Sequence, residues 1–381
     1  MTNKSIPIFR STSPPNKYLS KYLLKIEKSG RLTNFGPLSM DLESRIQKIT
    51  GRRTIAVTSG TVGLYLALAA ANISEEDDAV ILPSFNFAAG LQAIIQMNKR
   101  PLFVDIDKNY CISLDHLRHL LKTNSRCSAV IAVNYYGWAG NPKEVEEVVR
   151  KVEKEDSRRI CLIFDSAHAF GASYYGRPIG SYGDFEVFSF SATKVIGGAE
   201  GGAVTCSNSE YAERLEIARN YGTKNYHILN IGTNGKLSEP NAAYILARMD
   251  YMKEIISHRS KLAHKYFSAL KKITSVVPPY IHKNWAPVYK DIIVQLQGDE
   301  NFNRANIRNK LWVYGIDTRA YFWPPLHLSS LVSNKKISLP CTEDIADRIL
   351  ALPFYDELTT DEIEWISEKL EFILSESTLK S

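Results

Sequence analysis

Short apolar segments alternate with Ala/Leu-rich or amphipathic segments through the first two thirds of the chain. The apolar segments have the length and β-branched or aromatic content of strands. They lie at residues 54–57, 79–82, 102–104, 130–133, 161–164, 185–190 and 203–206, with helical patterns at 64–71 and 90–97. Apolar strands of this kind are buried on both faces. The pattern predicts an α/β fold with a mainly parallel sheet and helices on both faces.

After about residue 250 the pattern changes. An amphipathic helix is expected at 259–270, a strand at 291–296, an aromatic and Pro-rich segment at 319–327, and helices at 343–350 and 360–374. We therefore expect two domains, a large α/β domain over 1–250 and a smaller C-terminal α+β domain over 251–381.

Composition narrows the functional classes. The 381 residues are 44% hydrophobic and 23% charged, which is typical of a globular protein, and the net charge is +6. The basic residues are scattered, so a nucleic-acid partner is not expected, although an anionic substrate suits the charge. Five cysteines form no CxxC pair and are expected to be reduced thiols rather than metal ligands. Without a signal-like or membrane-length apolar segment, a cytoplasmic protein without a membrane partner is expected.

Lys194 carries the strongest chemical signal, because an apolar strand pattern delivers it into a glycine-rich turn. A desolvated lysine has a lowered pKa and becomes an amine nucleophile. Asp165 follows another apolar strand. Pyridoxal 5'-phosphate (PLP) chemistry needs such a pair, since the amine forms a Schiff base and the carboxylate keeps the pyridine nitrogen protonated. Taken alone, Lys194 also fits an exposed position past a strand end.

Other residues near predicted strand ends complete a candidate PLP site. Gly60 and Thr61 stand where a helix begins, a natural phosphate site, and Ser189 is a second phosphate candidate. Phe87 is a candidate to stack on the pyridine ring, and His168 to meet its hydroxyl oxygen. Each also has a structural alternative: a helix cap, a strand serine, a core phenylalanine or a structural histidine. Ligands of parallel sheets gather at the carboxyl ends of strands, which favours one shared site.

Taken together, the segments resemble the DegT/DnrJ/StrS family of PLP-dependent sugar aminotransferases. The resemblance covers nearly the whole chain. Its segments are residues 32–37, 59–61, 83–87, 103–107, 165–168, 189–194, 200–202, 325–327 and 352–354.

The resemblance implies a fold and residue roles. It implies fold type I, with a mainly parallel seven-stranded sheet and a smaller C-terminal domain. Lys194 would be the Schiff-base lysine and proton shuttle, and Asp165 the partner of the pyridine nitrogen. The remaining cofactor contacts would be His168 at the ring oxygen, Phe87 on the ring face, and Gly60, Thr61 and Ser189 at the phosphate.

The resemblance also implies a homodimer with shared active sites. Asn234 would reach the phosphate bound by the neighbouring subunit, while its place before Gly235 also fits a simple turn residue. The chain departs from the family at Asn134, at Ser191 and at Ala199, where histidine, histidine and glycine are usual. None of these positions carries the central chemistry, but all bear on substrate identity.

The implied reaction moves an amino group from L-glutamate to a nucleotide-linked keto-deoxysugar, with PLP cycling through pyridoxamine phosphate. The segments around residues 234–236 and 321–325 look like the branch that converts dTDP-4-keto-6-deoxyhexose to a 4-amino-4,6-dideoxyhexose. The product would serve O-antigen or lipopolysaccharide synthesis, or alternatively a secondary metabolite. Arg319 is a candidate for the pyrophosphate or the donor carboxylate, and His327 is a second candidate. A structural role is equally open for both.

Three alternatives stay open. One is an aminotransferase with a different substrate, either a 3-keto sugar or a sugar linked to GDP or UDP. Another is the PLP/pyridoxamine-phosphate sugar dehydratase branch, whose members replace the lysine with histidine, so Lys194 argues against it. The third is a non-catalytic PLP-binding regulator on the same scaffold.

Overall fold

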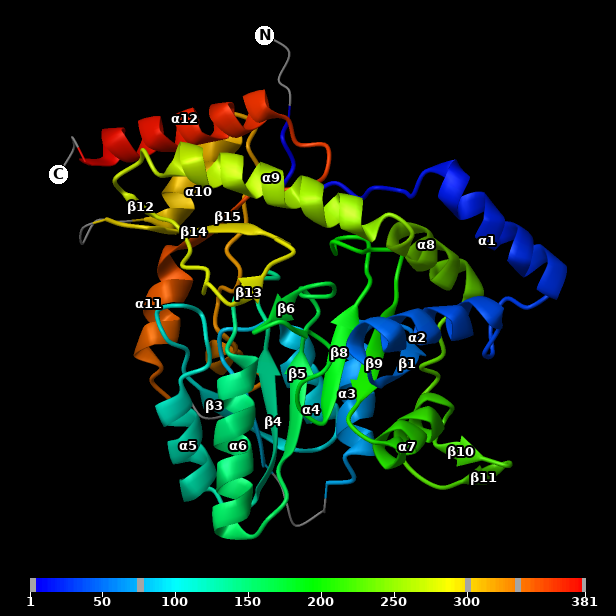
Figure 1. Ribbon diagram of the computed structural model, residues 1–381. Coiled ribbons are helices and arrows are strands. Elements are labelled where there is room, and N and C mark those ends of the chain that lie inside the picture. Colours follow the sequence, from blue (N-terminus) through cyan, green and yellow to red (C-terminus); the bar gives the residue numbers. More distant parts are fainter. Residues whose placement is uncertain (1–4, 74–78, 299–302, 333–336, 379–381) are drawn as a thin grey trace.

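A seven-stranded sheet forms the centre of the computed structural model, which describes residues 5–73, 79–298, 303–332 and 337–378 (Figure 1). In spatial order the strands are β1 (Arg53–Val57), β9 (Gly202–Cys206), β8 (Phe185–Ser189), β5 (Cys161–Asp165), β4 (Cys127–Val133), β2 (Ala79–Pro83) and β3 (Arg100–Val104). Only β9 runs antiparallel to its neighbours, β1 and β8. The predicted mainly parallel sheet and its seven strands are confirmed.

Each strand of this sheet buries both of its faces. In β5, Leu162 and Phe164 join one apolar cluster, whereas Cys161 and Ile163 join another on the opposite face. The first cluster is covered by α2 (Pro37–Thr50), α5 (Leu114–Thr123), α6 (Pro142–Asp156) and α8 (Glu239–Met249), with α1 (Asn16–Ser29) packed on α8. The second is covered by α3 (Gly60–Ala70), α4 (Ala88–Gln96) and α7 (Ser209–Arg219). Helices on both faces explain the uninterrupted apolar strands.

A second unit is built from the C-terminal third. The antiparallel strands β12 (Val276–Val277), β14 (Ile292–Leu296) and β15 (Ile349–Leu352) pack with α9 (Met252–Leu270), α10 (Arg304–Val313), α11 (Pro340–Arg348) and α12 (Thr360–Thr378). In Figure 1, α9 and α12 lie beside each other above the large sheet. The predicted helix over 343–350 extends too far, because its last two residues pair with β14 as part of β15.

Short elements complete the fold. They are β6 (Ser173–Tyr174), β7 (Arg177–Pro178), β10 (Thr223–Lys224), β11 (His227–Ile228), β13 (Trp285–Ala286) and a 3-10 helix at Leu326–Leu328. Within the residues that the structure describes, no helix combines the length and apolarity needed to span a bilayer.

The start of the chain packs with the C-terminal unit. Ile6 N donates to Gly315 O at 2.8 Å, and Phe354 N donates to Ile8 O at 3.1 Å. Ile6 and Ile8 are buried in the same apolar cluster as β14 and β15. The division at residue 250 stays a prediction, and these contacts associate the first residues with the smaller unit.

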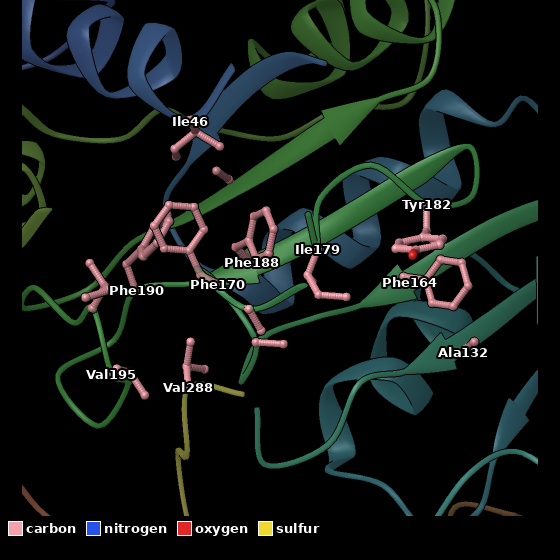
Figure 2. Close-up of a cluster of buried hydrophobic side chains, with 14 of the residues drawn as sticks. Ile46, Ala132, Phe164, Phe170, Ile179, Tyr182, Phe188, Phe190, Val195 and Val288 are labelled. Atoms are coloured by element: carbon pink, nitrogen blue, oxygen red, sulfur yellow. The ribbon is translucent and has the colours of Figure 1, made fainter. Parts of the chain in front are cut away.

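An aromatic cluster lies under the turn that follows β8. The ring centroids of Phe170 and Phe190 are 5.1 Å apart, and those of Phe170 and Phe188 are 5.0 Å apart. Figure 2 shows these three rings gathered together, with Val195 and Val288 in the same cluster. Val195 is the residue after Lys194, so this packing holds the backbone of the turn.

A buried ion-pair triad connects this turn to the C-terminal unit. Asp356 accepts from Arg248 at 2.9 Å and from Arg259 at 2.7 Å. Arg248 also donates to the carbonyl oxygen of Val195 at 2.9 Å. Burial alone would raise the pKa of Asp356, but the charges of Arg259 and Arg248 outweigh it and lower that pKa below 3.8.

We expect Asp356→Ala to lower the free energy of unfolding by about 3 kcal/mol at pH 7, because two buried guanidinium groups lose their counter-charge. The lowered pKa means that this stabilisation is present above pH 3.8 and is lost as the pH falls through the folded-state value. The difference between wild type and variant should therefore shrink in acid. Urea unfolding at several pH values measures it.

The matched control is Glu357→Ala, because Glu357 is the next residue and its side chain is exposed. Within the described residues, this carboxylate accepts a hydrogen bond from Thr12. It should change the unfolding free energy by less than about 1 kcal/mol. Equal losses in the two variants would contradict the assigned role of the triad.

Candidate active site

A cavity of about 330 Å³ opens at the carboxyl ends of the parallel strands. Its volume lies in the range of small-molecule sites. Loops after β1, β2, β4, β5 and β8 line it, together with Lys290, Asp291, Tyr321 and Phe322 from the C-terminal unit. The predicted residues that line it are Gly60, Thr61, Phe87, Asp165, His168, Ser189 and Lys194.

The start of α3 and the end of β8 approach each other closely. A Cβ atom on Gly60 would lie 3.0 Å from the Cβ of Ser189, so glycine permits this approach. The side chain of Ser59 accepts from Val62 N at 3.2 Å and caps the helix. The first N–H groups of a helix have no acceptor within it, so Gly60 and Thr61 offer donors beside the Ser189 hydroxyl. This arrangement suits a phosphate group.

The turn that carries Lys194 is held by its own backbone. Lys194 N donates to Ser191 O at 2.9 Å, and Gly198 N donates to Phe190 O at 2.7 Å. A Cβ on Gly197 would lie 2.6 Å from Ser191 O, so the turn requires glycine there. The turn is thereby fixed with the lysine side chain in the cavity wall.

The surroundings of Lys194 suit a candidate nucleophile. Its pKa is lowered from 10.5 to about 8, first by burial and next by the charge of Lys290. Asp291, Asp165 and Glu200 act in the opposite direction but are outweighed. An amine with this pKa is partly unprotonated near neutral pH and can both accept and donate a proton.

Asp165 ends β5 and is buried in the same cavity. Its Oδ1 accepts from Ala167 N at 3.1 Å. Burial raises its pKa, while the Ala167 N–H group and the charge of Lys194 partly counter that effect. A buried carboxylate needs a cationic or hydrogen-bonding partner, so the cavity favours a ligand with a protonated nitrogen at this point.

The two ring-contact candidates present suitable groups. Phe87 is 62% exposed although it lines the cavity, so its ring has room for a flat ligand. His168 accepts from Tyr136 N at its Nδ1, at 3.2 Å. Burial, followed by the charges of Lys194 and Lys290, holds the pKa of His168 well below 6.5. The neutral ring therefore carries its hydrogen on Nε2 and can donate there.

Stacked rings support this side of the cavity. The Phe322 ring stacks on Tyr136 at 6.1 Å and on His168 at 6.4 Å between centroids. Tyr136 Oη donates to Tyr321 O at 2.7 Å, which ties the C-terminal unit to the large sheet. The orientation of His168 thus depends on both units.

Three predicted residues lie outside the lining of this cavity. Asn234 is exposed and its role at a neighbouring subunit stays a prediction. Arg319 pairs with Asp317, and no contact with the cavity supports its predicted substrate role. His327 is buried, with Nδ1 2.6 Å from Ser84 Oγ and Nε2 3.2 Å from Glu343 Oε1. These contacts favour the structural alternative for His327, and its substrate role stays a prediction.

Lys290, Asp291 and Asn86 line the cavity but were not predicted from the sequence. Asn86 lies in segment 83–87, in which Phe87 was the predicted site residue. Lys290 and Asp291 precede an apolar strand, where charged residues are usually exposed. No local pattern shows that this strand borders a site formed by the other unit.

Comparison with known proteins decides the family. The sequence profile of the DegT/DnrJ/EryC1/StrS aminotransferase family matches residues 16–371. The chain belongs to this family. It is therefore an aminotransferase, and the resemblance inferred from its motifs is confirmed.

Relatives cover nearly the whole of this aminotransferase. A dTDP-4-amino-4,6-dideoxy-D-glucose transaminase of Shigella dysenteriae is 30% identical, over 95% of this chain and 97% of its own. A GDP-perosamine synthase of Escherichia coli O157:H7 is 31% identical, over 82% and 84%. The crystal structure of DesI with its TDP-sugar product has a TM-score of 0.89 at 30% identity, covering 99% of this chain and 95% of that one.

We expect Lys194 to react with an amine-acetylating reagent at a rate that rises with a midpoint near pH 8, because burial lowers its pKa to about that value. Short labelling pulses on cofactor-free protein, read by peptide mass spectrometry, measure the rate. Lys290→Met should move the midpoint to higher pH, since the charge of Lys290 helps to lower the pKa. A midpoint near 10.5 in the wild type would contradict the described electrostatics.

Proposed function

We propose that this aminotransferase transfers the amino group of L-glutamate to a nucleotide-linked keto-deoxysugar. The specific reaction proposed converts a dTDP-4-keto-6-deoxyhexose to its 4-amino-4,6-dideoxyhexose. One observation carries the proposal: the amine of Lys194 and the buried carboxylate of Asp165 share a cavity with a phosphate cradle. Family membership makes the chain an aminotransferase, which supports this use of the cavity.

The cavity fits PLP, the cofactor of this aminotransferase class, which cycles with pyridoxamine phosphate. Gly60, Thr61 and Ser189 would hold the phosphate, and the exposed face of Phe87 would cover the ring. The buried Asp165 would hold the pyridine nitrogen protonated, and His168 Nε2 would donate to the ring oxygen. When bound, PLP supplies an aldehyde that receives the amino group and a cationic ring that withdraws electrons.

Lys194 is the proposed acid and base of both stages. In the first stage its Nζ accepts the proton from the α-carbon of glutamate. The amino group would stay with the cofactor, and water would supply the keto oxygen of the departing 2-oxoglutarate. In the second, the keto oxygen of the sugar would leave as water, and Nζ delivers a proton to the carbon that carried it. A pKa of about 8 lets one amine serve both steps near neutral pH.

The substrate is proposed from the relatives. The two at 30% identity over nearly the whole chain are named for dTDP- or TDP-sugars, which favours a dTDP-linked substrate. A similarly identical relative is named for GDP-perosamine, so GDP-linked sugars belong in the test. Retention of Lys194 disfavours the dehydratase alternative, and the complete cradle disfavours a purely regulatory protein.

We propose that the protein acts as a homodimer. The segment 221–231 exposes a run of apolar side chains, which are Tyr221, Tyr226, Ile228, Leu229 and Ile231. Exposed apolar patches of this kind often mark protein interfaces. Asn234 follows this segment, which agrees with its proposed approach to the phosphate of a second subunit.

A cytoplasmic location and a role in O-antigen sugar synthesis are also part of the proposed function.

The purified protein should carry PLP and show a visible absorption band that borohydride bleaches. Mass spectrometry should then find the reduced cofactor attached to the Lys194 peptide. Lys194→Ala should lack the bleachable covalent band and lose transamination by at least about 10³-fold, because both nucleophile and proton carrier are removed. Lys253→Ala, on the exposed side of α9, is the control. A cofactor attached at another lysine would contradict the assigned site.

A panel of nucleotide-linked keto sugars with glutamate tests the substrate. We expect nitrogen to enter the dTDP-4-keto-6-deoxyhexose at carbon 4, with kcat/KM at least about 10-fold above the UDP- and GDP-linked or 3-keto sugars. Product mass and NMR give the position and stereochemistry. Loss of a sugar hydroxyl without gain of nitrogen would instead support a dehydratase.

A further inference from the structure

A buried ion pair in the cavity wall is not used by the proposed transamination. Lys290 Nζ lies 2.6 Å from Asp291 Oδ1, and the two residues are only 8% and 6% exposed. Both line the cavity that contains Lys194. Removing two charges from water is costly, so a buried pair is weak evidence for a stabilising role. Its place in the cavity suggests a ligand-binding role.

The backbone of the pair is fixed from several directions. Lys290 N donates to Tyr136 O at 2.7 Å, and Lys290 O accepts from Arg259 Nη2 at 3.0 Å. Trp138 Nε1 donates to Asp291 O at 3.3 Å. The two side chains therefore enter the cavity from a rigid position at the start of β14, rather than from a loose loop.

The pair has hydrogen-bonding capacity to spare. Asp291 Oδ2 is buried and has no partner among the described residues. An ammonium group has three N–H donors, and one of those of Lys290 is directed to Asp291 Oδ1. A buried acceptor left unpaired is costly, so a ligand that donates a hydrogen bond there would remove this cost.

The charge of the pair selects the kind of ligand. Together Lys290 and Asp291 are neutral, and they offer an acceptor and donors side by side. A carboxylate or phosphate would meet repulsion from Asp291, and a cation would meet repulsion from Lys290. A neutral group that both donates and accepts, such as a hydroxyl, suits both side chains. The charge of Lys290 also acts on Lys194 and His168, so a ligand held here lies near the reacting centre.

We propose that Lys290 and Asp291 recognise hydroxyl groups on the hexose ring of the nucleotide-sugar substrate. This assignment rests on the proposed function. It adds the residues that would bind the sugar part of the substrate rather than its nucleotide part. Asp291 Oδ2 accepts from one sugar hydroxyl, and Lys290 Nζ donates to a neighbouring oxygen. The pair thereby orients the ring while Lys194 moves the proton.

Binding to the pyridoxamine-phosphate form, without turnover, tests the assignment. Calorimetry would compare dTDP-glucose with dTDP, using the UDP or GDP pair instead if the substrate panel selects that nucleotide. In the double variant Lys290→Met/Asp291→Leu, which replaces the pair with apolar groups of similar size, we expect about 10-fold weaker dTDP-glucose binding. Binding of dTDP should stay within about 2-fold, because no sugar contact is lost.

Two further variants make the result interpretable. Asp291→Asn keeps the shape of the side chain and should weaken dTDP-glucose binding in the same direction, also without a change for dTDP. Lys253→Met, an exposed lysine on α9, should change neither. Unfolding temperatures of all variants show whether they remain folded.

Equal loss of affinity for dTDP-glucose and dTDP, or no loss for either, would overturn the assignment and leave the proposed function intact. A wild-type enzyme that binds none of the nucleotide hexoses more tightly than the bare nucleotides, and aminates none of them, would overturn the proposed function itself. The two failures are therefore distinguishable.

Discussion

The proposed chemistry depends on holding one half-buried lysine amine in a cavity at the edge of a mainly parallel sheet. Burial lowers the pKa of Lys194 to about 8, and the nearby charge of Lys290 adds to that effect. An amine in this position tends to regain water, so the surrounding turn must be rigid. Gly197, the Arg248 bond to Val195 and the aromatic cluster under the turn supply that rigidity.

The order of the strands explains how the cradle forms. β9 lies between β1 and β8, and Gly202 pairs with Val57 on one side and Ser189 on the other. A Cβ on Gly202 would lie 2.6 Å from the carbonyl carbon of Ser59, so only glycine lets the start of α3 settle over β9. Gly60 then reaches Ser189 across the intervening strand. Two glycines far apart in sequence thus build the proposed phosphate site.

Much of the fold could be predicted because its signals are local. Strands buried on both faces give predominantly apolar runs, and the sequence pattern predicts all seven. The antiparallel direction of β9 is not encoded in such a run, and neither is the switch from helix to strand at Ile349, where pairing with β14 prevails. Local periodicity fails where a distant strand provides the hydrogen bonds.

The residues of the candidate site also fall into those that the sequence predicts and those that it does not. Residues at or just after strand ends, such as Asp165 and Lys194, could be predicted because the topology gathers strand ends together. Lys290 and Asp291 could not, since they reach the cavity only through packing of the two units. His327 was a candidate substrate contact with a structural role equally open, and its contacts with Ser84 and Glu343 favour the structural role.

The most direct test of the central claim is a crystal structure of the protein grown with PLP. The account predicts continuous density from Lys194 Nζ to the cofactor, with a carboxylate oxygen of Asp165 within hydrogen-bond distance of the pyridine nitrogen. Cofactor bound elsewhere, or a ring nitrogen turned away from Asp165 while Lys194 points into solvent, would contradict it.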